Sequence, residues 1–234
     1  GYAIGDYLPW SFMKLYMVSY HLPVRDRNGN RMNYRTVYER LVSEIRFQIR
    51  RVSGLIDEVI RIAGESGIPC RSAGLRIDAH QHAHLIPIVW KALMQVIDED
   101  SLDMEYIRTA HEPIGVFARH FAITFSPIGI VKNRLLAFHA PKAERFVSSK
   151  GRKPAYLWGL IMSGHMDMDR IEKIMPDMLK ICTAKGYDIE INIHPGRMLE
   201  SELCAEIPED SARTFYMTKD RDMETEMARV FHNR

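Results

Sequence analysis

The stretch from Arg76 to Pro87 constrains the chain most, because it places a carboxylate and three imidazoles at every second position. If this stretch is extended, Asp78, His80, His82 and His84 share one face, opposite small or apolar side chains. Such a set is costly to bury unless the charge and each ring nitrogen have partners. A bound divalent cation is such a partner for both imidazole nitrogen and carboxylate oxygen, so the spacing favours a metal-dependent active site. A histidine-rich surface loop, or core histidines bonded to backbone, is the alternative.

The surrounding pattern places these histidines at a strand-to-helix junction. Pro87 suits the first turn of a helix that continues through Ile97. Further strands are expected at 14–22, 104–108, 155–163 and 188–194. Further helices are expected at 33–63, 114–123, 128–136, 170–185 and 222–231. Residues 142–153 show no clear helical or strand pattern. This alternation predicts a parallel α/β fold, a distorted (β/α) barrel resembling a TIM barrel. His21, Arg108 and His194 would lie at strand carboxyl ends, where such folds bind ligands.

Composition narrows the class of protein. The 234 residues are expected to form a single domain spanning 1–234. A net charge of +2 argues against a nucleic-acid or anionic-membrane surface. Three widely spaced cysteines fit reduced thiols, and no run reads as a membrane span or secretory signal, so a cytoplasmic protein is expected. The oligomeric state is left open, with a homodimer as one option.

Four features in this order resemble the YdjC-like carbohydrate deacetylases: His21, the string from Asp78 to Pro87, Arg108, and Ile193-His194-Pro195-Gly196. The resemblance covers roughly residues 14–200. It implies a distorted barrel, one divalent cation (magnesium or zinc), and removal of N-acetyl groups from amino sugars or chito-oligosaccharides. Carried over by position, the metal ligands would be His21 and His80, the proton donor would be His194, and the residues that orient the site would be Asp78 and Arg108. His82 and His84 would bind sugar hydroxyls or support the ligands.

One part of the family pattern is missing. The family's first strand carries two consecutive Asp residues, a metal ligand and the catalytic base, and this sequence contains no Asp-Asp pair. We expect the first β/α unit to be missing from the given chain rather than the base to be lost from the protein. Two alternatives stay open: another barrel metallohydrolase of the phosphoesterase type, and a sugar-binding remnant without catalysis.

Overall fold

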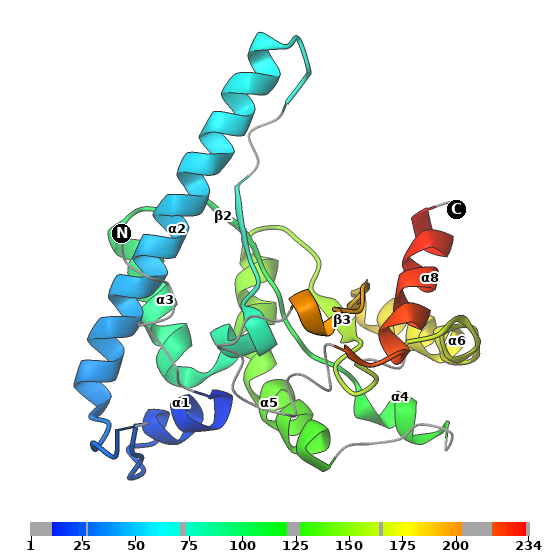
Figure 1. Ribbon diagram of the computed structural model, residues 1–234, viewed down its shortest axis with the longest axis horizontal. Coiled ribbons are helices and arrows are strands. Elements are labelled where there is room, and N and C mark those ends of the chain that lie inside the picture. The colour runs from blue at the N-terminus through cyan, green and yellow to red at the C-terminus, as the bar shows by residue number, and fades with distance from the viewer. Residues whose placement is uncertain are drawn as a thin grey trace. The chain divides into compact units, whose positions relative to one another are not determined.

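A computed structural model describes residues 11–26, 28–70, 74–120, 127–163, 166–202 and 217–232 (Figure 1). The chain divides into two compact units. Unit 1 comprises Gly1–Arg108 and His139–Arg152, and unit 2 comprises Thr109–Phe138 and Lys153–Arg234. The described strands form one two-stranded parallel sheet in each unit. The fold is thus mixed helix and strand with small parallel sheets, and closure into a barrel stays a prediction.

The sheet of unit 1 pairs β1 (Leu75–Ile77) with β2 (Met104–Ile107), and α3 (Pro87–Glu99) connects them. Pro87 occupies the first turn of α3, as predicted. Apolar side chains of α3 at i and i+4 spacing, Leu93 and Ile97, pack with Met104 and Ile107 of β2. This packing supports the carboxyl end of the sheet, where the histidine-rich stretch begins.

The first segment of unit 1 differs from the prediction. Residues 14–22 were expected to form a strand, but α1 spans Phe12–Ser19 as a helix. Ser11 caps it, because its hydroxyl accepts a hydrogen bond from the Lys14 N–H at 3.4 Å. Leu15 and Val18 are buried at helical spacing, so the aromatic and apolar run was misread as a strand.

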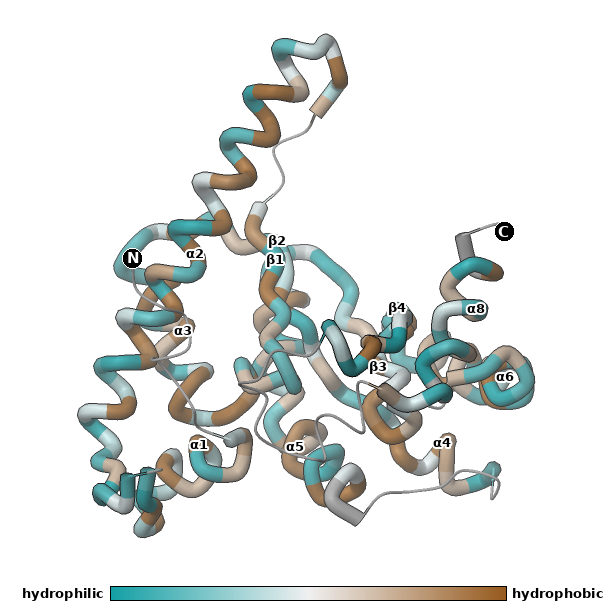
Figure 2. The backbone as a smooth tube through the Cα atoms, viewed as in Figure 1, coloured by the Kyte–Doolittle hydropathy of each residue, from teal (hydrophilic) through white to brown (hydrophobic). Residues whose placement is uncertain are grey.

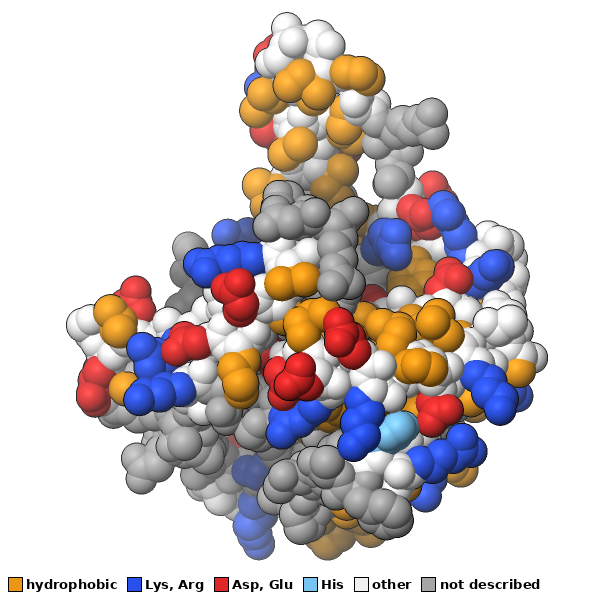
Figure 3. Space-filling view, turned by 90° about the vertical axis from the view of Figure 1, so that its right-hand side faces the viewer, with side chains coloured by type: hydrophobic (Ala, Val, Ile, Leu, Met, Phe, Trp, Pro, Cys, Tyr) orange, Lys and Arg blue, Asp and Glu red, His pale blue; other side chains and the backbone are white. Residues whose placement is uncertain are grey.

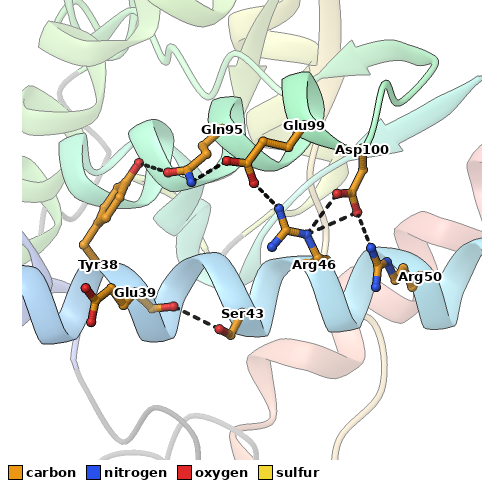
Figure 4. A network of polar contacts seen from close by, with 8 residues as sticks. All are labelled: Tyr38, Glu39, Ser43, Arg46, Arg50, Gln95, Glu99 and Asp100. Atoms are coloured by element: carbon orange, nitrogen blue, oxygen red, sulfur yellow. Dashed lines mark hydrogen bonds and ion pairs between the residues drawn. The ribbon is translucent and has the colours of Figure 1, made fainter.

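Helix α2 (Tyr34–Glu65) starts after the cap residue Asn33 and ends two residues beyond the predicted end at 63. Its first half is fixed to α3 by the polar network of Figure 4. There the Arg46 guanidinium donates to Asp100 at 3.0 Å and also pairs with Glu99, and Arg50 donates to Asp100 at 3.1 Å. Beyond Arg50 the helix continues for about four turns, and Figure 2 shows hydrophobic and hydrophilic residues alternating along it.

Unit 2 contains the second parallel pair, β3 (Ala155–Trp158) and β4 (Asp188–Ile191), connected by α6 (Met168–Lys185). Asp167 caps α6 by accepting from the Arg170 N–H at 2.9 Å, so the helix begins two residues before the predicted start at 170. The helices α4 (Ile114–Ala118) and α8 (Asp220–His232) and the short η3 (Glu200–Glu202) also belong to the unit. Gly159 ends β3 at φ 125°, where an added Cβ would lie 2.1 Å from the Asn192 carbonyl oxygen, so only glycine fits between the two strand ends.

Helix α5 (Pro127–Ser149) corrects a second prediction. The segment 142–153 was expected to lack a pattern, but α5 continues through Pro141 to Ser149. Ala140, Ala143 and Val147 are fully buried at i, i+3 and i+7, so small side chains carry a helical period that charged neighbours obscure. None of the described helices combines the length and the apolar character needed to cross a membrane.

Candidate active site

The histidine-rich stretch is a tight turn rather than an extended strand. Residues His80–Leu85 form a 3-10 segment, η2, in which Gln81 (φ 55°) and His82 (φ 59°) are left-handed. The predicted alternation of faces is therefore wrong for this segment. The two left-handed residues reverse the chain, so that His80 is exposed while His82 and His84 are buried. Consecutive left-handed residues other than glycine are costly, and such backbone recurs at functional sites.

His84 connects this turn to the end of β2. Its Nε2–H donates to the carbonyl oxygen of Arg108 at 2.7 Å, and its Nδ1 accepts from the Ala79 N–H at 3.3 Å. Burial lowers the pKa of His84 to about 4, so the ring is neutral. Because both ring nitrogens are used inside the protein, the geometry favours support of the site over binding of a sugar hydroxyl.

Asp78 and Arg108 meet where β1 and β2 end. The Arg108 guanidinium donates a hydrogen bond to Asp78 Oδ2, and Asp78 Oδ1 lies 3.5 Å from His82 Nδ1. Burial alone would raise the pKa of Asp78, but the His82 ring and the Arg108 charge outweigh it and lower that pKa. The His82 Nδ1 atom is buried and has no hydrogen bond within the described residues. Among the described residues the imidazole and the carboxylate therefore face each other at 3.5 Å without a well-formed hydrogen bond, which is unusual for a buried polar atom.

His21 lies after α1 rather than at a strand end, with a left-handed backbone (φ 59°). Its ring stacks on Tyr34, with the ring centroids 4.6 Å apart. It lines an open pocket of about 570 Å³ together with Arg31, Asn33 and Arg35, among others. His80 does not line this pocket.

His194 of unit 2 follows β4, as predicted, and a carboxylate supports it from behind. Glu224 of α8 is fully buried, accepts a hydrogen bond from the His194 backbone N–H, and lies 3.7 Å from His194 Nδ1. Ser163 Oγ is 3.4 Å from the same ring nitrogen. Burial would raise the pKa of Glu224, but its hydrogen bonds from His194 and Met166 lower it, so the group is an anion.

Helix α8 holds the whole turn after β4. Besides the Glu224 contact, Thr225 Oγ1 accepts from the Gly196 N–H at 2.7 Å, and Arg221 Nε donates to the Gly196 carbonyl at 2.9 Å. Glu224 was not among the predicted site residues. Its only sequence signal is its i, i+3 spacing to the buried Met227, which puts a carboxylate on the packed face of an otherwise charged helix.

A second buried carboxylate, Glu112, was also missed. It accepts hydrogen bonds from the backbone N–H groups of Gly159, Leu160 and Ile161 at 2.7–3.1 Å. The Asn133 side-chain amide donates to it as well. Desolvation by burial raises the pKa of Glu112 to about 7 despite these hydrogen bonds. Glu112 thus organises the turn after β3, which is in contact with the strand end that leads to His194.

The described residues do not make a complete cation site. Within residues 11–232, excluding the undescribed gaps, no three His, Cys, Asp or Glu side chains are grouped so as to hold a metal ion. Asp78 and His82 are the nearest pair of donors in the turn, and His21 and His80 are each exposed. The predicted metal ligation by His21 and His80 therefore stays a prediction.

Comparison with known proteins yields one match. No curated protein and no solved structure matches the chain. The family model described as YdjC-like protein matches residues 73–230, which include Asp78, His80, Arg108, His194 and Glu224 but not His21. Because the match covers more than half of the chain, this protein belongs to the YdjC-like family, which is related to the carbohydrate deacetylases.

Proposed function

We propose that this protein acts in the hydrolysis of N-acetyl groups on acetylated amino sugars or chito-oligosaccharides. The observation that carries the proposal is the His194–Glu224 pair at the end of β4, in a chain of this family. Unit 1 separately carries the Asp78–Arg108 pair at the ends of β1 and β2. Residues at the carboxyl ends of parallel strands are the usual catalytic positions in α/β folds.

Amide hydrolysis sets the requirement for His194. Water forms a bond to the acetyl carbon, the C–N bond breaks, and the departing amine must gain a proton. An imidazole is suited to donate that proton at neutral pH. In this proposal the buried Glu224 anion positions the ring from its Nδ1 side, so that the imidazole is oriented to donate the proton.

Arg108 is proposed to bind an oxygen of the substrate. Its guanidinium is oriented by Asp78 and presents a rigid fork of N–H donors, a geometry suited to binding oxygen atoms. The Asp78 side chain is 41% exposed, which places the pair within reach of solvent. The His84 ring also donates a hydrogen bond to the backbone carbonyl of Arg108, so the turn and the arginine are held together.

The family resemblance also implies a divalent cation, and we propose His21 and His80 as ligands on that ground alone. No group of three His, Cys, Asp or Glu side chains among the described residues could hold that cation. Chelation of the full-length protein tests the cation independently of the fold. If activity survives exhaustive chelation while His80→Ala is inactive, His80 has another role.

The proposed activity is tested by acetate release from N-acetylated chito-oligosaccharides with the full-length protein. His194→Gln should abolish release while leaving the unfolding transition unchanged, because the ring is partly exposed and its loss costs little packing. A screen of generic phosphate esters distinguishes the phosphoesterase alternative. Binding of the sugar without any turnover would favour the non-catalytic alternative.

A further inference from the structure

The outer half of α2 carries an apolar stripe that nothing described in unit 1 covers. The stripe consists of Val52, Leu55, Val59 and Ile62, whose exposed fractions are 49%, 60%, 61% and 49%. Figure 3 shows hydrophobic side chains gathered along this end of the helix. Contiguous apolar surface of this kind marks an interaction site rather than ordinary exposure.

The spacing of the stripe is that of a coiled coil. The four residues are separated by three, four and three positions, which corresponds to a, d, a and d of a heptad with valine at a and leucine or isoleucine at d. Ile56, 37% exposed, adjoins the stripe at position e. A helix with this pattern buries its seam against another helix, because a single helix cannot cover it.

The charges beside the stripe indicate which partner fits. Arg51 and Glu65 occupy g positions at the two ends of the seam, with Glu58 between them. If a second copy lies antiparallel, Val52 faces Ile62 of that copy and Leu55 faces its Val59. In this register Arg51 faces Glu65 of the second copy, and the pair occurs twice by symmetry. In a parallel pair Arg51 would instead face Ile56, without a charge partner.

Within α2, Glu65 already pairs with Arg61 at 2.5 Å, and Arg61 also donates to Glu58 at 2.7 Å. Arg61 therefore offsets the repulsion expected where Glu58 meets its symmetry mate near the centre of the seam.

We propose that the outer half of α2 binds a second copy of this chain as a short antiparallel coiled coil. The seam spans about 15 Å, so a reversible, concentration-dependent dimer is expected.

Charge exchange between copies tests this proposal on the full chain by sedimentation velocity. Arg51→Glu and Glu65→Arg should each weaken self-association, because each homodimer then contains two like-charge contacts. An equimolar mixture of the two variants should associate again, because each substituted side chain then meets an opposite charge on the other variant. A structural defect would not be repaired by mixing.

Leu55→Asp should weaken association on the order of 100-fold, because both copies lose a buried leucine. The matched control is Leu179→Asp on α6, at a leucine that is 52% exposed and lies off the stripe, which should leave association unchanged. A parent chain that stays monomeric at the highest concentration measured would overturn the proposal, including the case in which it binds lipid vesicles instead. Association that Leu55→Asp leaves intact, or a mixture no tighter than its components, would overturn it as well.

Discussion

Replacing His84 with glutamine should remove an acid-sensitive contribution to stability. The folded protein holds His84 neutral, since burial lowers its pKa to about 4, whereas the unfolded chain protonates it near the ordinary value of 6.5. Between these values the unfolded state binds the extra proton, so acid favours unfolding. The stabilisation is complete above pH 6.5, is lost as the pH falls toward about 4, and changes no further below that.

The magnitude follows from the two pKa values. A fall from 6.5 to about 4 corresponds to about 3 kcal/mol of unfolding free energy. Glutamine can keep the hydrogen bond to the Arg108 carbonyl through its Nε2 donor, but it does not titrate. At neutral pH the variant should lose only about 1 kcal/mol, for the hydrogen bond from the Ala79 N–H.

The assay is urea unfolding of the parent and His84→Gln across this pH range, with the difference in unfolding free energy plotted against pH. The difference should shrink and then change sign as the pH falls, because only the parent is penalised by acid. His80→Gln, at an exposed imidazole in the same turn, is the matched control and should follow the parent. A constant difference between parent and His84→Gln would refute the buried, neutral assignment of His84.

Three further predictions concern the carboxylates and the arginine. Because burial raises the pKa of Glu112 to about 7, the parent should lose about 3 kcal/mol of unfolding free energy as the pH rises from 4.5 through about 7. Glu112→Gln should remove that pH dependence, and an unchanged dependence in urea unfolding would contradict this prediction. Glu224→Gln should lower kcat for deacetylation on the order of 10- to 100-fold, because His194 loses the carboxylate that positions it. Glu226→Gln, on the exposed face of α8, should leave kcat unchanged. Equal rates for the two variants would count against the role of Glu224 in positioning His194. Arg108→Lys should raise KM on the order of 10-fold, because a lysine ammonium lacks the planar fork of donors with which a guanidinium can bind Asp78 and the substrate together. An unaltered KM would show that Arg108 does not bind the substrate.

Much of the fold could be predicted because periodicity and caps are local signals. Pro87 marked the start of α3 correctly, the helix predicted from residue 33 begins at Tyr34, and the strands that lead to Arg108 and His194 begin where they were predicted. The turn at His80–Leu85 could not be read, because left-handed Gln81 and His82 leave no composition signal and their cost is met by tertiary hydrogen bonds of His84.

The buried carboxylates were missed for the same physical reason. Glu112 and Glu224 are paired with backbone N–H groups of residues about 50 and 30 positions away, and a single sequence does not show such long-range partners. His194 could be found because the Pro-Gly turn after it is a local mark. The carboxylates that support the candidate site residues therefore depend on partners that are distant in the chain.

The most direct measurement of the central claim is acetate release from an N-acetylated chito-oligosaccharide by the full-length protein, compared with its His194→Gln and Glu224→Gln variants. We expect release by the parent, about 10- to 100-fold slower release by Glu224→Gln, and none by His194→Gln. Release by His194→Gln at the parent rate, or no release by the parent from any acetylated amino sugar, would contradict the account.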